Sequence, residues 1–124
     1  MKGLAAEGNA TSQLVESYFA AEMRRDAKRV VEHFCDDAVL VLPDGHRLVG
    51  REAIGTFYAQ VYSQVTKLDV RVVSMLAADG LTAVEWEASV VDESGGIQAL
   101  RGVNVFRTSG GRFADVHTYF GPVA

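Results

Sequence analysis

Apolar positions along this chain first follow helical periodicity and then strand periodicity. The segment "SQLVESYFAAEMRR" predicts a helix from about residue 12 to 25, because its apolar side chains recur three or four residues apart. These side chains are Leu14, Val15, Tyr18, Phe19 and Met23. Glu16, Glu22 and Arg24 fall elsewhere on the helical wheel. Residues 1–10 are rich in Gly and Ala without periodicity, so we expect a flexible leader before a single domain over residues 11–124.

Two more helices and a strand pair complete the first half. Asp26 is a suitable N-cap for a short helix over "AKRVVEHF". The β-branched run "AVLVLP" predicts a strand, and "DGHRLVG" predicts a turn with a short return strand. A third helix over "REAIGTFYAQVYSQ" gathers apolar and aromatic side chains on one face: Ile54, Phe57, Tyr58, Val61 and Tyr62.

The second half is typical of an antiparallel meander. Four strand-like segments, "LDVRVVSMLA", "LTAVEWEASVV", "IQALRGVNVFRT" and "RFADVHTYFG", are separated by "ADG", "DESGG" and "SGG". These separators favour tight turns, because Gly and Asp tolerate positive φ. Helices that precede such a meander indicate an α+β fold.

The strand "GVNVFR" is apolar on both faces. Val103 and Val105 fall on one side, whereas Asn104 and Phe106 fall on the other. A sheet with one face in water would alternate apolar and polar residues. We therefore expect one face to pack on the helices and the other on a second copy of the chain, which gives a homodimer.

Composition narrows the choice of partners. The formal net charge of -4 argues against nucleic acid, whose binding proteins usually carry a clustered basic surface. There is no signal-peptide pattern and no apolar segment long enough to span a membrane, so we expect a cytoplasmic protein that binds no membrane. The single cysteine, Cys35, excludes an internal disulfide and a cysteine-based metal site.

Four stretches resemble a known superfamily in their order and spacing: "VVEHFCDDAVLVLPDG", "GREAIGTFY", "TAVEWEASV" and "RGVNVFRTSGGRFADVHTYFG". They are similar to the nuclear transport factor 2-like proteins, which include SnoaL-like polyketide cyclases and ketosteroid isomerases. The resemblance spans about residues 12–121. It implies a cone-shaped fold, with three N-terminal helices on a curved, mainly antiparallel sheet, an apolar pocket between them, and dimers through the outer sheet face. It does not specify activity, since this fold hosts both enzymes and silent binding modules.

The resemblance to ketosteroid isomerases implies three site positions. Those enzymes combine a carboxylate base with an oxyanion hole made of a tyrosine and a protonated acid. The tyrosine matches Tyr18, the protonated acid matches Asn104, and the base matches Leu42. Leucine cannot accept a proton, but Tyr18 and Asn104 can still donate hydrogen bonds to a substrate oxygen. Alternatively, the Asn104 amide belongs to a structural network with Tyr18 or the backbone.

Other candidate acids and bases are weaker. The aspartate that serves SnoaL-type cyclases matches Thr118, which is no acid or base at neutral pH. Strand alternation points the adjacent His117 to the opposite face, and Asp44 before Gly is typical of a turn. His33 and His46 have no partner at ligand spacing, so no metal is expected. Nucleotide-binding and hydrolase motifs are missing from the sequence, so no cofactor is expected either.

The "VEWEA" segment presents either an aromatic or an acidic face to the pocket. We expect Trp86 to point inward, because burial of Glu85 and Glu87 without partners is costly. Arg71 and Arg101 on neighbouring strands could then pair with these glutamates.

The predicted pocket leaves three functions open. Its expected lining residues are Leu42, Phe57, Tyr58, Trp86, Phe106, Thr118 and Phe120. Tyr58 and Tyr62, four residues apart, either rim this pocket or belong to the core. The protein could be an enzyme acting on a carbonyl-containing, polyketide- or steroid-like compound, with Tyr18 and Asn104 as catalytic residues that polarise an oxygen. It could instead be a non-catalytic module that binds a small apolar or aromatic molecule, or an assembly subunit whose pocket is vestigial.

Overall fold

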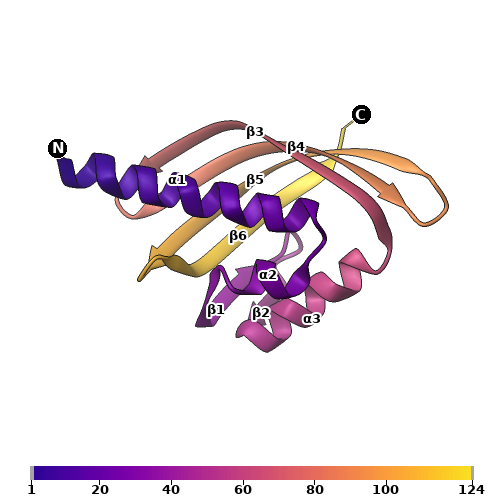
Figure 1. Cartoon of the computed structure of the whole chain (residues 1–124), viewed down its shortest axis with the longest axis horizontal. Helices are drawn as coiled ribbons and strands as arrows, with labels where there is room; N and C mark the ends of the chain where they lie inside the picture. The colour runs from indigo at the N-terminus through magenta and orange to yellow at the C-terminus, as the bar shows by residue number, and fades with distance from the viewer. Residues whose placement is uncertain (1, 124) are drawn as a thin grey trace.

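Three helices lie over one face of a six-stranded sheet (Figure 1). The computed structural model describes the backbone of residues 2–123 and the side chains of residues 10–123. The helices are α1 (Lys2–Met23), α2 (Ala27–Val31) and α3 (Arg51–Tyr62). The strands are β1 (Phe34–Val41), β2 (Arg47–Val49), β3 (Val65–Ala78), β4 (Leu81–Asp92), β5 (Ile97–Ser109) and β6 (Arg112–Pro122).

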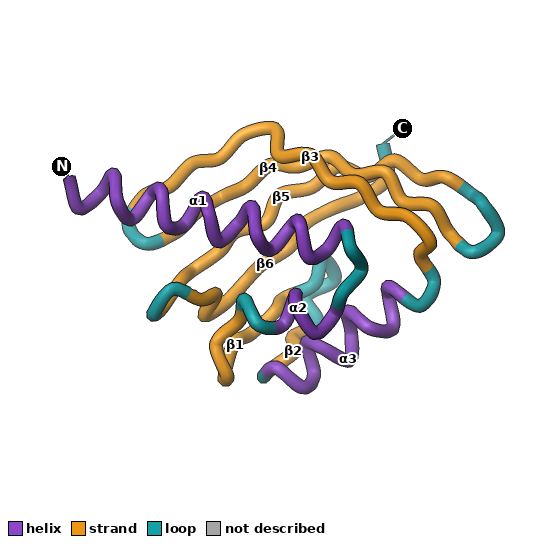
Figure 2. The backbone as a smooth tube through the Cα atoms, in the orientation of Figure 1, coloured by secondary structure: helices purple, strands orange, loops and turns teal. Residues whose placement is uncertain are grey.

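The sheet has the strand order β2-β1-β6-β5-β4-β3. Strands β1 and β6 are parallel, and the other neighbours are antiparallel. The long strands β3 to β6 lie behind α1, and β3 curves down to meet the end of α3 (Figure 2). This arrangement confirms the predicted α+β fold, with three helices on a mainly antiparallel sheet. The parallel contact between β1 and β6 was not predicted.

Helix α1 begins about ten residues earlier than its apolar periodicity indicates. It runs from Lys2 to Met23, so the backbone of residues 2–10 continues the helix where the sequence predicted an aperiodic leader. Ala, Leu and Glu at positions 4–7 have high helix propensity, which accounts for this extension. The helix ends before Arg25, whose φ of 53° lies in the left-handed region.

Local signals for the other two helices are confirmed. The Asp26 carboxylate accepts a hydrogen bond from the Arg29 backbone N–H at 3.1 Å and so caps α2. Gly50 precedes α3 with a φ of 90°, a conformation that favours glycine. None of the helices in the described part of the chain is long and apolar enough to cross a membrane.

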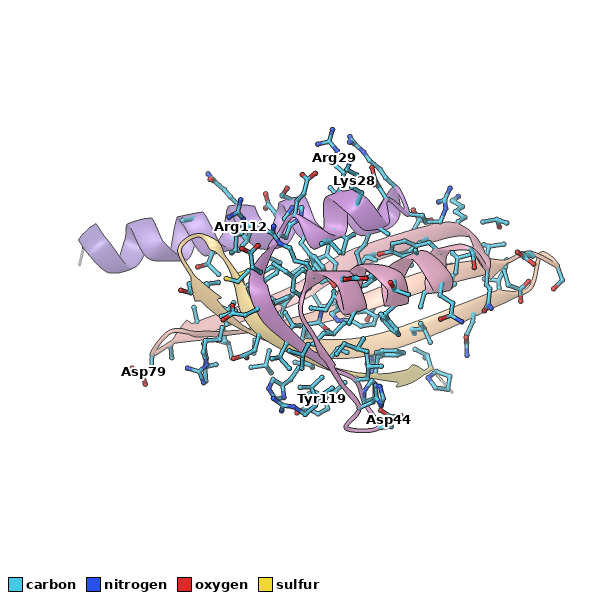
Figure 3. All side chains as sticks on the ribbon, turned by 90° about the horizontal axis from the view of Figure 1, so that it is seen from below. Lys28, Arg29, Asp44, Asp79, Arg112 and Tyr119 are labelled. Atoms are coloured by element: carbon cyan, nitrogen blue, oxygen red, sulfur yellow. The ribbon has the colours of Figure 1, made fainter. Side chains whose placement is uncertain are left out.

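The side chains of β5 are divided between the two faces of the sheet as the alternation of the strand predicts. Asn104 and Phe106 on β5 are 3% and 0% exposed and face the helices, whereas Val103 and Val105 are half-buried on the outer face. Tyr119 on β6 pairs with Val103 and is 53% exposed. It points away from the helices, on the opposite side of the molecule from Lys28 and Arg29 (Figure 3).

Candidate functional site

An apolar cavity of about 220 Å³ lies between helices α1 and α3 and the inner face of the sheet. Its apolar walls come from both helices and from strands β1, β3, β4, β5 and β6. They include Phe19, Leu40, Val61, Val65, Leu68, Val70, Ala88, Val90 and Leu100. Polar groups are few and come from Glu22, Gln98, Asn104, Thr118 and three tyrosines. An apolar cavity with a few polar groups is the usual design of a small-molecule site.

The cavity brings together most of the residues that the sequence proposed. Tyr18 and Asn104 both line it, as do Leu42, Phe57, Tyr58, Trp86, Thr118 and Phe120. For Tyr62, the sequence allows either a place in the core or one at the rim of the pocket. The structure shows that Tyr62 lines the cavity. Side chains from α1, α3 and five strands, far apart in sequence, therefore converge on one space.

Phe106 was predicted to line the pocket, and this prediction was wrong. It is fully buried outside the cavity lining, where its ring stacks on Phe113 with centroids 4.4 Å apart. Phe106 lies two residues beyond Asn104 on the same strand face, so its side chain sits about 7 Å further along β5. There it packs in an aromatic cluster with Tyr18 and Phe113, whose rings also contact Phe34.

The Asn104 carboxamide is held by two hydrogen bonds to its oxygen. The Trp86 indole Nε1–H donates to Asn104 Oδ1 at 3.1 Å, and the Thr118 hydroxyl donates to the same atom at 2.7 Å. The indole nitrogen is a donor only, so it must face the amide oxygen rather than the amide nitrogen. The Nδ2–H₂ group is thereby left as a donor at the cavity wall, with no acceptor among the described side chains.

Asn104 was interpreted either as a hydrogen-bond donor to a ligand or as part of a structural network. Each interpretation applies to a different atom of the side chain. Its oxygen belongs to a structural network, although the partners are Trp86 and Thr118 rather than Tyr18 or the backbone. Its nitrogen supplies the hydrogen-bond donor that a ligand oxygen needs. Thr118, which donates to this oxygen, helps to orient the amide.

Gly102 makes room for the indole ring. Trp86 on β4 is the cross-strand partner of Gly102 on β5. A Cβ atom at Gly102 would lie 2.5 Å from Trp86 Cζ2 and 2.6 Å from the Tyr119 backbone oxygen. The absence of a side chain at Gly102 therefore leaves the indole ring room to lie against β5, where its N–H reaches Asn104.

Helices α1 and α3 face each other through two matched hydrogen bonds. The hydroxyls of Tyr18 and Tyr58 are 2.6 Å apart, and the Tyr62 hydroxyl donates to Glu22 Oε1 at 2.6 Å. Residues 18 and 22 are one turn apart on α1, as are residues 58 and 62 on α3, so both pairs use the same register. Burial, followed by the nearby Glu22 charge, raises the pKa of both Tyr18 and Tyr58 well above the usual value. Both phenols therefore stay protonated and remain donors.

Glu22 is the cavity residue that the sequence reasoning missed. The helical periodicity assigns Glu22 to a face of α1 away from the apolar side chains. In the structure, Glu22 lines the cavity and is half-buried. Burial raises the pKa of its carboxyl above the usual value, and the hydrogen bond from Tyr62 partly opposes this shift. The signal was in the sequence: Glu22 follows Tyr18 by four residues and Phe19 by three, which puts it on their helix face.

The prediction that Trp86 points inward is confirmed. Trp86 is 8% exposed, while Glu85 and Glu87 lie on the outer face. Glu87 Oε2 lies 2.7 Å from Arg71 Nη2, and Glu87 Oε1 lies 3.7 Å from Arg101 Nη2, as the neighbouring-strand pairing predicts. Hydrogen bonding and the charge of Arg71 lower the pKa of Glu87. These glutamates take no part in the cavity.

The remaining candidates lie outside the cavity. Asp44 is exposed and accepts from the His46 backbone N–H at 2.9 Å, as a turn former does. His117 is half-buried on the outer face, 3.9 Å from Asp115. The His33 ring lies between Ser17 Oγ and the Arg29 carbonyl, each at 2.8 Å. Within the described residues, no group of three or more His, Cys, Asp or Glu side chains is arranged to hold a metal ion.

The fold and cavity define a pocket domain built from helices over a curved sheet. A model of the SnoaL-like domain matches residues 15–116, and the chain belongs to this family. Among curated proteins, a search found no match to the sequence.

Solved structures agree with this fold at low sequence identity. An NTF2-like protein of unknown function from Burkholderia pseudomallei is 20% identical with a TM-score of 0.80, over 90% of this chain and 91% of that one. A ketosteroid isomerase-like protein from Catenulispora acidiphila, in complex with trimethylamine, is 18% identical with a TM-score of 0.78, over 86% and 83%. An LEH-like epoxide hydrolase from M. tuberculosis is 18% identical with a TM-score of 0.79, over 91% and 84%.

Proposed function

We propose that this protein is an enzyme that binds a compact apolar carbonyl compound in the cavity and polarises its oxygen. The observation that carries the proposal is the orientation of Asn104, whose Nδ2–H₂ donor is turned to the cavity by the Trp86 bond. A second donor comes from the Tyr18 and Tyr58 pair, because only one of two bonded hydroxyls donates to the other. Donors fixed before substrate arrives are the usual means of stabilising charge on a reacting oxygen.

The cavity size limits the ligand. A cavity of about 150 Å³ holds benzene, so a cavity of about 220 Å³ suits one or two fused rings. A four-ring steroid would have to extend beyond the cavity. Phe57, Trp86 and Phe120 at the walls favour a flat, aromatic or partly aromatic molecule.

A binding experiment tests this proposal with 2-tetralone and tetralin, which share a bicyclic shape and differ in the carbonyl. Trp86 is the single tryptophan of the chain, so its indole N–H resonance reports cavity occupancy. We expect 2-tetralone to bind roughly 3- to 30-fold more tightly than tetralin, as one or two hydrogen bonds would give. Tyr18→Phe should reduce this preference, whereas the exposed control Tyr119→Phe should not. Equal affinities, or no binding of either compound, would contradict the proposal.

The non-catalytic binding module is the second candidate function, supported by Leu42 and Thr118 at the family's acid/base positions. On this alternative, 2-tetralone binds with the same preference but is recovered unchanged, without proton exchange, after long incubation.

The outer face of the sheet supports association of two copies. An outer patch of Leu76, Ala83, Val103, Val105 and Tyr119 is apolar, and Leu76 is 77% exposed. Burial of such a face against an identical one satisfies the two-sided strand pattern, and we expect a homodimer formed through the outer patch.

A further inference from the structure

The cavity contains one carboxylic acid. Of its lining residues in the described part of the chain, Glu22 is the one Asp or Glu, and none is Lys, Arg or His. Its carboxylate shares the cavity with the Asn104 amide and the tyrosine hydroxyls. The positions at which relatives resembling this chain carry their acid or base hold Leu42 and Thr118, neither of which can accept a proton.

We propose that Glu22, on helix α1, is the catalytic proton acceptor of this cavity, and that Tyr62 is the residue that positions it. This inference rests on the proposed function, because it requires a bound carbonyl compound. It assigns proton transfer to a helix rather than to the strand positions of Leu42 and Thr118.

The geometry leaves part of the carboxylate available to a ligand. The Tyr62 hydroxyl donates to Oε1 at 2.6 Å, and no described side chain forms an ion pair with Glu22. A carboxylate offers about four acceptor sites on two oxygens, so one short bond from Tyr62 fixes its direction without using its capacity. Tyr62 in turn is held on α3, whose Tyr58 lies against Tyr18.

The surroundings of Glu22 make its carboxylate a stronger base than an exposed one. The groups that face it are the phenols of Tyr18, Tyr58 and Tyr62, while β3 and β4 present Val65, Leu68, Val70, Trp86, Ala88 and Val90. No cation is among the causes that shift its pKa, and burial raises the pKa of Glu22, which strengthens the carboxylate as a proton acceptor.

The reaction step is an exchange of one proton. The Glu22 carboxylate removes a proton from the carbon next to the carbonyl, and the C–H electron pair becomes the C=C bond of an enolate. The carbonyl π pair moves to the oxygen, which accepts hydrogen bonds from the Asn104 amide and a tyrosine hydroxyl. Glu22 then returns the proton to a carbon of the same enolate. Atoms and electrons balance without an oxidant, a reductant or a second substrate.

The experiment follows deuterium uptake at the activated carbon of 2-tetralone in D₂O by ¹H NMR. The variant Glu22→Gln keeps an oxygen acceptor for Tyr62 and removes the base, and the control is Glu16→Gln on the exposed face of α1. We expect exchange above the buffer rate in the wild type and a loss of about 100-fold or more in Glu22→Gln, while Glu16→Gln is unchanged. Glu22→Asp, which retains a carboxylate on a shorter stem, should recover part of the rate. Thermal melts show whether each variant is folded.

The pH profile separates positioning by Tyr62 from a structural role. Exchange should rise with pH as Glu22 ionises. Tyr62→Phe removes a hydrogen bond that lowers the Glu22 pKa, so the midpoint of its profile should move to higher pH. An unmoved midpoint would overturn the role given to Tyr62.

Failure of this inference is distinguishable from failure of the proposed function. If the wild type exchanges 2-tetralone and folded Glu22→Gln exchanges it at the same rate, Glu22 is not the base and the proposed function stands. If 2-tetralone binds but the wild type does not exchange it, the inference and the enzymatic proposal both fall and the non-catalytic binding module remains. If neither 2-tetralone nor tetralin binds, both proposals fall.

Discussion

The indole N–H of Trp86 donates to the carboxamide oxygen of Asn104 at 3.1 Å, and this bond determines which end of the amide meets the cavity. Trp86 and Asn104 lie on neighbouring strands, β4 and β5, with Asn104 paired to Val84 and Trp86 paired to Gly102. The contact is thus a diagonal one across a strand pair. It couples the stability of the sheet to the polarity of the site.

Asn104→Leu should destabilise the protein, because it removes the acceptor of a buried indole N–H. The cost of one orphaned donor is about 1–3 kcal/mol in the free energy of unfolding. A vestigial pocket predicts the opposite, since apolar replacement of a useless polar group should stabilise. Urea unfolding of Asn104→Leu distinguishes the two, and a more stable variant would contradict the network.

Asn104→Asp is the matched variant, because it keeps an oxygen for Trp86 and Thr118. The apolar site should raise the pKa of the new carboxyl above its unfolded value. A raised pKa in the folded state means that its stability is fully present below the unfolded pKa and is lost as pH rises through the folded pKa. Asn104→Asp should therefore exceed Asn104→Leu in stability at pH 4 and lose this advantage toward pH 8.

The half-buried Glu22 carboxyl should contribute a loss of stability as pH rises. Its folded pKa is raised, so the folded state binds the proton more tightly than the unfolded state does. Stability is then greatest below the unfolded pKa and decreases as pH rises through the folded value. Glu22→Gln removes this loss, so its Tm relative to the wild type should increase from pH 4 to pH 8. Glu16→Gln is the control, and a Tm difference independent of pH would contradict the shift.

Much of the fold could be predicted from sequence, because it is encoded locally. The periodicity of apolar residues, the helix caps and the turn residues indicated the helices and strands. The free-energy cost of burying the two neighbouring glutamates gave the correct prediction that Trp86 points inward. The parallel pairing of β1 with β6 has no local signal, since it joins segments separated by four strands and a helix. Glu22 was missed because a charged residue was assigned to solvent, although its spacing from Tyr18 put it on the inner face.

Gly102→Ala should destabilise the site by overpacking. The added Cβ would meet Trp86 Cζ2 at 2.5 Å, the Tyr119 carbonyl oxygen at 2.6 Å and Phe120 Cβ at 2.7 Å. Backbone and indole must both shift, at a cost of about 1–3 kcal/mol. Gly121→Ala on β6 is the control, because a Cβ there meets nothing within 4 Å. The Trp86 indole N–H resonance should move in Gly102→Ala alone, and an unchanged spectrum would show that the indole does not depend on this glycine.

The outer patch should determine the oligomeric state. We expect the wild type to sediment at twice the mass of the chain, and Leu76→Lys combined with Tyr119→Lys to sediment as a monomer. Both side chains are mostly exposed in the single chain, so the substitutions leave its core intact. Ala20→Lys on the exposed face of α1 is the control. A monomeric wild type, or a double variant that remains dimeric, would refute association through this face.

Leu42 offers a gain-of-function test of the cavity's orientation. It lines the cavity just after β1, and the resemblance in sequence predicts that this position matches the base of ketosteroid isomerases. If Asn104 and the tyrosine pair hold a carbonyl as proposed, a carboxylate at position 42 should reach the adjacent carbon. Leu42→Asp added to Glu22→Gln should therefore restore deuterium exchange of 2-tetralone by about 10-fold or more over Glu22→Gln alone. Leu42→Asn is nearly isosteric with Asp but cannot accept the proton, so it should restore nothing. Equal rates for the two folded variants would mean that the bound carbonyl does not point its acidic carbon toward β1.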